Sequence, residues 1–113
     1  MIKLSIKAQA KTSKYIELSQ SLYSMQTNLE KLCSSLIISE ENKVFYIIAK
    51  LNSTNCLDNI LNSKEIKILS GTLKILSKHT EISIQGLKQQ LISNDISGIQ
   101  SQYSLINKTE ILK

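Results

Sequence analysis

The order of apolar patterns along the chain constrains its fold more than any other feature. Apolar residues alternate with polar ones in stretches typical of half-buried strands, and they recur every three or four residues in stretches typical of packed helices. In chain order, the predicted elements are a strand at 2–8, a helix from Thr12 or Ser13 to Leu32, strands at Ser34–Ser39 and Val44–Leu51, a helix from Ser53 or Thr54 to Leu76, and a strand at Thr80–Leu87. This is the order of an α+β, ferredoxin-like βαββαβ sandwich. We therefore predict one such domain over residues 1–87, with residues 88–113 as a C-terminal extension.

Each predicted helix has one apolar side. In the first helix this side comprises Tyr15, Leu18, Leu22, Met25, Leu29 and Leu32. In the second it comprises Leu57, Ile60, Leu61, Ile68, Leu69, Leu73 and Leu76. Thr12 or Ser13 is expected to cap the first helix, because a hydroxyl accepts a backbone N–H bond. Gly71 lies within the second and costs about 1 kcal/mol relative to Ala, so we predict a kink or a break near residues 63–70.

The segment Val44–Leu51 predicts an assembly of more than one chain. Asn42 precedes it, and Asn tolerates the left-handed backbone of tight turns, so a hairpin is expected there. Val44–Leu51 is apolar on both faces, which is typical of a central strand covered on both sides. One layer of helices covers only one face of a small sheet. We therefore expect a second copy of the chain to cover the other face.

Residues 88–113 have no clean apolar period. We predict a short irregular or helical stretch followed by a strand at Tyr103–Ile106. Such an extension either packs on a partner subunit or forms a partly mobile tail, and both interpretations stay open.

Charge and cysteine content exclude several classes of function. All fourteen basic residues are lysines, and lysine lacks the guanidinium fork that reads phosphate and guanine, so no nucleic-acid partner is expected. No apolar run approaches the roughly 20 residues of a membrane span, and the first residues lack a signal-peptide pattern, so no membrane partner is expected. Cys33 and Cys56 form no CxxC motif, which favours reduced thiols in a cytoplasmic protein without a metal site.

The element order and two short motifs resemble the antibiotic biosynthesis monooxygenase family over about residues 2–87. At the first helix–strand junction that family tends to show a Thr, a Glu, a Pro-Gly pair and a small or Cys residue. The corresponding residues here are Thr27, Glu30, Lys31, Leu32 and Cys33. After the third strand the family usually has an aromatic residue, a helix with a His, and a Ser. The corresponding residues here are Leu51, Ile60 and Ser63.

The resemblance implies a homodimer that forms a dimeric α+β barrel, in which two sheets face each other and each subunit has a pocket between sheet and helices. It also implies oxidation of quinols or polycyclic phenols by O2 without metal or flavin. No cofactor is therefore expected, and the expected ligand is a small aromatic compound. Haem breakdown, an activity of related enzymes, is not expected, because Ile60 replaces the His that would hold iron.

Cofactor-free oxygenation needs a base or hydrogen-bond donors for a phenolate beside an apolar cavity. His79, which is the only histidine, and Tyr46, on the central strand, are the candidate catalytic residues. The structural alternatives are a helix C-terminal role for His79 and a core or interface role for Tyr46. Tyr15, Ile60 and Cys33 are expected to line the pocket.

Two functions remain open at this point. The first is a cofactor-independent, monooxygenase-like protein that acts on a small aromatic or quinol-type compound. The alternative is a non-catalytic dimeric barrel that binds a small apolar ligand or serves as an interaction module. A closed cavity lined by Tyr46 and a polar group favours the enzyme, whereas a space filled with Ile and Leu side chains favours the module.

Overall fold

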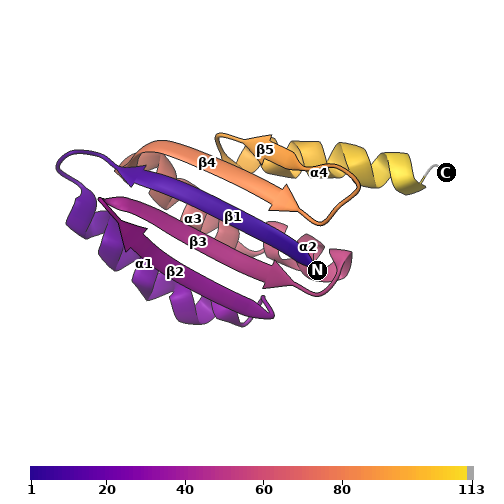
Figure 1. Cartoon of the computed structure of the whole chain (residues 1–113), viewed down its shortest axis with the longest axis horizontal. Coiled ribbons are helices and arrows are strands. Elements are labelled where there is room, and N and C mark those ends of the chain that lie inside the picture. Colours follow the sequence, from indigo (N-terminus) through magenta and orange to yellow (C-terminus); the bar gives the residue numbers. More distant parts are fainter. Residues whose placement is uncertain (112–113) are drawn as a thin grey trace.

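The computed structural model describes the backbone of residues 1–111 and the side chains of residues 1–106. The strands are β1 (Ile2–Ala10), β2 (Ser35–Glu41), β3 (Val44–Leu51), β4 (Ser77–Gln85) and β5 (Leu91–Ser93), and the helices are α1 (Tyr15–Glu30), α2 (Thr54–Leu61), α3 (Lys64–Leu76) and α4 (Ile96–Ile111). The strands form one antiparallel sheet in the order β2-β3-β1-β4-β5, with α1 and α3 behind it (Figure 1). The first four strands have the ferredoxin-like order, so the predicted α+β fold is confirmed.

Serine side chains set the starts of α2 and α3. The Ser53 hydroxyl accepts a hydrogen bond from the Cys56 N–H at 3.3 Å, and the Ser63 hydroxyl accepts one from the Ile66 N–H at 3.1 Å. The second cap begins a new helix, so the predicted break near residues 63–70 is confirmed. The predicted caps of the first helix are wrong, because Lys14 is its N-cap residue and makes no side-chain capping bond.

The β2–β3 hairpin turns at Asn42 and Lys43. Their φ angles are 53° and 66°, and a two-residue hairpin with a type I′ turn requires positive φ at both positions. The hairpin predicted from Asn42 is therefore confirmed.

The hydrophobic core fills the space between the sheet and the helices. Its largest fully buried side chains are Phe45, Leu4, Leu18, Leu22, Leu51, Leu57, Ile60, Ile66, Leu69, Ile82, Ile84 and Ile99. Ile68, predicted to lie in this core, is 49% exposed, and Ile66 is buried instead. The reason is that α3 begins as a separate helix at Lys64, and its buried residues Ile66, Leu69 and Leu73 follow each other by three and four.

The C-terminal segment extends the sheet and the core. β5 pairs with β4, and Ile96, Ile99 and Tyr103 of α4 are buried with the main core. The strand predicted at Tyr103–Ile106 is wrong, because these residues belong to α4. Within the described part of the chain, no helix has the length and apolar character needed to cross a bilayer.

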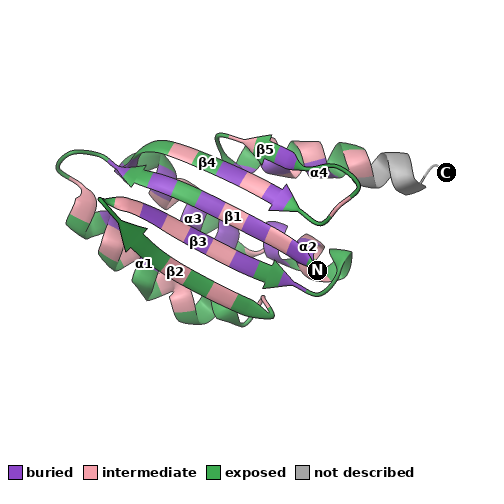
Figure 2. Ribbon diagram, in the orientation of Figure 1, coloured by how far each residue is buried: buried purple, intermediate pink, exposed green. Residues whose placement is uncertain are grey.

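The two faces of β3 have different environments. Phe45, Ile47, Ala49 and Leu51 face the helices and are buried. Val44, Tyr46 and Ile48 face the other way and are only half-buried, and the same alternation runs along β1 (Figure 2). We call this second side of the sheet the open face. Within one chain, the predicted cover on both sides of the strand is therefore present on one side only.

Candidate functional site

Side chains on the open face lie in rows that cross the sheet. One row, taken from β2 to β5, consists of Ile37, Ile48, Ser5, Ser83 and Ile92. The next consists of Ser39, Tyr46, Lys7 and Glu81, and the one after it of Glu41, Val44, Gln9 and His79. The first row is therefore made of isoleucine and serine side chains, whereas the charged groups of these three rows lie in the second and third.

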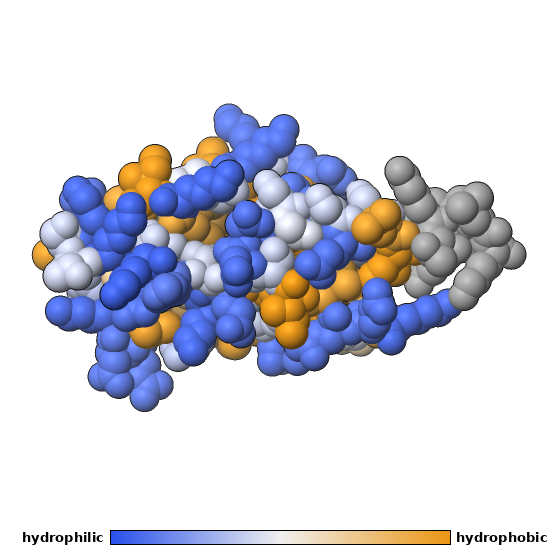
Figure 3. Space-filling view, turned by 90° about the horizontal axis from the view of Figure 1, so that it is seen from above, coloured by the Kyte–Doolittle hydropathy of each residue, from blue (hydrophilic) through white to orange (hydrophobic). Residues whose placement is uncertain are grey.

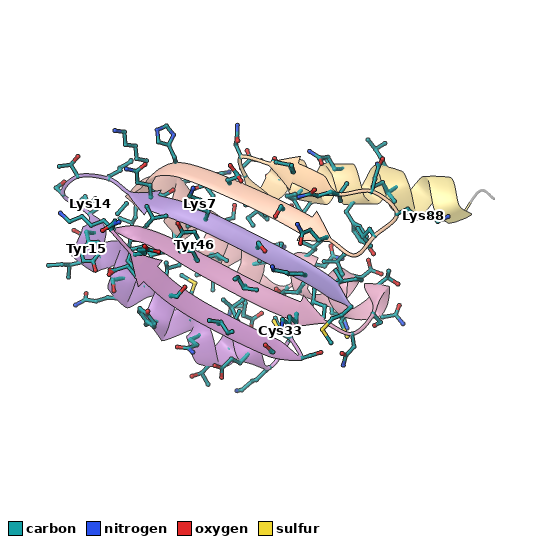
Figure 4. The ribbon with its side chains drawn as sticks, viewed as in Figure 1. Lys7, Lys14, Tyr15, Cys33, Tyr46 and Lys88 are labelled. Carbon is teal, nitrogen blue, oxygen red and sulfur yellow. The ribbon has the colours of Figure 1, made fainter. Side chains whose placement is uncertain are left out.

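The two predicted catalytic residues lie in neighbouring rows of the open face. Tyr46 is opposite Lys7 on the adjacent strand, and Figure 4 shows both side chains near the centre of the sheet. His79 is opposite Gln9 and is exposed. The structure thus places Tyr46 and His79 on one face but separates them by the width of β1.

Two hollows flank the start of β4. The open-face hollow has a volume of about 400 Å³ and is lined by residues of β1, β3 and β4 that include Lys7, Gln9 and His79. The helix-side hollow has a volume of about 300 Å³ and lies between the C-terminal half of α3, the first residues of β4 and the start of α4. His79, Thr80 and Asn94 line both hollows.

Hydrogen bonds inside the helix-side hollow fix the direction of two hydroxyl protons. The Ser77 hydroxyl donates to the Leu73 carbonyl at 2.6 Å, and its oxygen lies 2.7 Å from Oγ1 of Thr80. A serine hydroxyl has one proton, so the Thr80 hydroxyl must be the donor in the second bond. The Thr80 hydroxyl, on a residue that lines the hollow, therefore has no proton left to donate to a ligand.

The acidic residue of the helix-side hollow is already engaged. The N–H of Gly98 donates to Oδ1 of Asp95 at 2.7 Å, and the N–H of Asp95 lies 3.4 Å from Oγ of Ser93. These contacts cap the first turn of α4. The capped turn brings Asn94, Asp95 and Ile96 against the start of β4.

The three predicted pocket-lining residues lie on the helix side of the sheet, away from Tyr46 and His79. Ile60 is 1% exposed and belongs to the packed core. Tyr15 is half-buried at the start of α1, where its ring stacks on Phe45. The structure therefore does not bring the five predicted residues into one site.

Cys33 follows α1 and is half-buried. Its thiol donates to the Leu29 carbonyl at 3.2 Å. Burial, followed by the nearby Cys56 and Glu30, raises the pKa of the Cys33 thiol to about 11. This thiol stays protonated at neutral pH, which disfavours a nucleophilic role.

Sequence reasoning did not identify Thr80, Asn94 or Asp95 as site residues. A signal for Asp95 was present, because Ser93-Asn94-Asp95 precedes the apolar residue Ile96 in the manner of a helix N-terminus. No local signal places that turn beside His79. Among the described side chains, no group of three or more His, Cys, Asp or Glu residues could hold a metal ion.

Solved structures of other proteins share this fold. An antibiotic biosynthesis monooxygenase aligns with a TM-score of 0.65 and 13% identity, over 79% of this chain and 100% of that chain. Rv0793 from Mycobacterium tuberculosis aligns with a TM-score of 0.66 and 14% identity, over 78% and 95% of the two chains. A conserved protein from Methanosarcina mazei Go1 aligns with a TM-score of 0.64 and 24% identity, over 77% and 92%. No family model and no curated protein matches the sequence.

Proposed function

We propose that this protein is a cofactor-independent, monooxygenase-like protein that acts on a small aromatic or quinol-type compound at the start of β4. The observation that carries the proposal is the position of His79 on the border of both hollows, in a fold shared with an antibiotic biosynthesis monooxygenase. Imidazole accepts a proton near neutral pH, which suits it to the activation of a phenol. Tyr46 lies two strands away on the open face and lines neither hollow, so its predicted catalytic role stays a prediction.

The proposed reaction needs no external reductant. The base removes a proton from a hydroquinone, and the electron-rich anion transfers electrons to O2. A carbon–oxygen bond forms, one oxygen atom remains on the ring, and the other leaves as water. Hydroquinone and O2 then give hydroxyquinone and water, and the substrate supplies all four electrons that reduce O2.

The open face supports a homodimer as the working unit. Ile37 is 53% exposed and lies opposite Ile48, while Ile92 at the other edge is 55% exposed. Burial of apolar side chains against a second sheet is favourable by about 25 cal/mol per Å². We propose that two open faces meet and form a dimeric α+β barrel. The contact predicted between residues 88–113 and the partner subunit stays a prediction.

A non-catalytic dimeric barrel is the second candidate, and two observations favour it. The space between the sheet and the helices is filled by Leu, Ile and Phe side chains. His79 is exposed, so water competes with a substrate for hydrogen bonds to its imidazole. For either candidate we propose a cytoplasmic location with reduced thiols, and both Cys33 and Cys56 are free.

Oxygen uptake separates the two candidates. A panel of hydroquinones is added to the purified protein, and O2 consumption and product mass are measured for the wild type and for His79→Gln. Gln85→Ala is the matched control, because Gln85 lies exposed on the same face of the same strand. Consumption that is lost in His79→Gln and retained in Gln85→Ala supports the enzyme. If no compound of the panel causes O2 consumption, the enzyme is contradicted and the non-catalytic barrel is the remaining candidate.

The dimer is tested by the mass of the protein in solution. Ile48→Asp places a charge in the centre of the open face, so it is expected to convert a dimer into a folded monomer. Ile68→Asp is the matched control, because Ile68 is 49% exposed on the outer side of α3. A wild-type protein that is monomeric at all concentrations contradicts the barrel.

A further inference from the structure

We infer that the helix-side hollow binds a one-ring aromatic carboxylate that carries a hydroxyl group on the ring. This inference rests on the proposal that the ligand site is at the start of β4, and it names the class of compound. It requires neither oxygen chemistry nor a dimer. Three features of the hollow lead to it: its floor, its charged rim and the fixed proton of Thr80.

The floor of the hollow selects a small apolar body. Leu73 of α3, Ile82 of β4 and Ile96 of α4 line it from three elements. The volume of about 300 Å³ is at the lower end of the range for ligand cavities. One planar ring therefore fits the space better than a polycyclic compound.

The rim of the hollow selects a negative charge. Lys74 and Lys78 are spaced four apart at the end of α3 and the start of β4, and both line the hollow. Asp95 is the acidic residue that faces them, and its Oδ1 already accepts the Gly98 N–H. The positive charge on the rim therefore exceeds the negative charge, and a carboxylate is the simplest group that lysine ammonium groups hold at a ring end.

The wall of the hollow selects a hydrogen-bond donor. The Thr80 proton is committed to Ser77, whose own proton is committed to the Leu73 carbonyl. The Thr80 oxygen can therefore accept a bond but cannot donate one. A ring hydroxyl on the ligand meets this requirement, whereas a second carboxylate or an ether oxygen does not.

Three probe compounds and three variants test the inference by NMR titration of the protein over residues 1–113. The probes are 4-hydroxybenzoate, benzoate and 4-hydroxybenzamide. We expect 4-hydroxybenzoate to bind tightest, with about fivefold loss on removal of the hydroxyl group and a similar loss on removal of the charge. The shifted amide resonances should belong to residues that line the helix-side hollow.

The variants test which residue contacts the carboxylate of the ligand and which contacts its ring hydroxyl. Lys74→Gln should lower the affinity for both carboxylates severalfold and leave the affinity for 4-hydroxybenzamide unchanged. Lys67→Gln is the matched control, because Lys67 is exposed on the same helix outside the hollow. Thr80→Val keeps the shape of the side chain and the Ser77–Leu73 bond, and should remove the preference for 4-hydroxybenzoate over benzoate.

Specific results overturn the inference. Equal affinities for the three compounds, equal effects of Lys67→Gln and Lys74→Gln, or no saturable shift at millimolar concentration would each do so. Thermal unfolding of every variant excludes loss of the fold as the cause. The titrations are done without O2, so they are independent of the oxygen-uptake assay. If the protein binds 4-hydroxybenzoate but consumes no O2 in that assay, the oxygenase proposal is refuted and this inference stands. If it consumes O2 but does not bind the carboxylate, this inference is refuted and the oxygenase proposal stands.

Discussion

The ring of Tyr15, the first residue of α1, stacks on the ring of Phe45 in β3, with their centroids 5.6 Å apart and their planes inclined by 25°. Lys43 of the β2–β3 turn lies over the same tyrosine, with Nζ 6.0 Å from the ring centroid. The start of α1 has no side-chain cap, and this stack is one of the contacts that join it to the sheet.

Truncation of Tyr15 should therefore destabilise the protein. Tyr15→Ala is expected to lower the free energy of unfolding by about 1–3 kcal/mol, because a half-buried aromatic stack is lost. Tyr15→Phe keeps both rings and should change little. Urea unfolding of the three proteins measures the difference, and equal midpoints for Tyr15→Ala and the wild type would contradict this account.

The cap of α3 should contribute measurably to stability. The Ser63 hydroxyl accepts from the Ile66 N–H and donates to the Ile60 carbonyl at 2.6 Å. Ser63→Ala should lower the free energy of unfolding by about 1 kcal/mol or somewhat more. Ser13→Ala is the control, since Ser13 is exposed and does not cap α1. An equal loss in both variants would argue against the assigned cap.

Two glycines should respond to alanine with opposite signs. Gly71 lies within α3 with no atom within 4 Å of an added Cβ, so Gly71→Ala should stabilise the protein by about 1 kcal/mol. Gly86 has a φ of +98°, and an added Cβ would lie 2.5 Å from the Met1 carbonyl oxygen, so Gly86→Ala should destabilise it. Thermal unfolding gives both signs, and destabilisation by Gly71→Ala would show a contact absent from the single chain.

Alkylation of Cys33 should be slow and strongly dependent on pH. Its pKa, raised from 9.0 to about 11 mainly by burial, leaves little thiolate at pH 8. A Cys56→Ser protein isolates this thiol and keeps burial, the largest cause of the shift, although it loses the smaller contribution of Cys56, so its iodoacetamide rate should still keep rising above pH 9. A plateau near pH 9, as for an exposed thiol, would refute the shift.

The same shift predicts a loss of stability in alkali. Between pH 9 and pH 11 the unfolded chain releases the Cys33 proton while the folded chain retains it. Unfolding is then favoured as the pH rises, so this contribution to stability is present below pH 9 and declines above it. Urea midpoints of Cys56→Ser and of Cys33→Ser/Cys56→Ser between pH 8 and pH 10.5 should converge as the pH increases.

The sequence was most informative where the physical cause is local. The alternation along β1, the hairpin at Asn42 and the serine between α2 and α3 each depend on a few neighbouring residues. It was least informative at Tyr103–Ile106, where the residues lack a clear period, and where the helix that forms buries Tyr103 beside α2, with its hydroxyl 3.5 Å from the Thr54 carbonyl oxygen. Ile68 shows the same limit, because a shift in where α3 begins moves the whole buried side of the helix.

The element order, and with it the ferredoxin-like fold, was determined by the sequence itself, because hydrophobic periodicity records which side of each element is buried. Which of the candidate site residues lie close together was decided only by the tertiary structure. Strand register places Tyr46 opposite Lys7 and away from Ile60, and the return of the chain after β5 brings Asn94 beside His79. These contacts join residues far apart in sequence through backbone pairing and burial, and no local pattern of side chains encodes them.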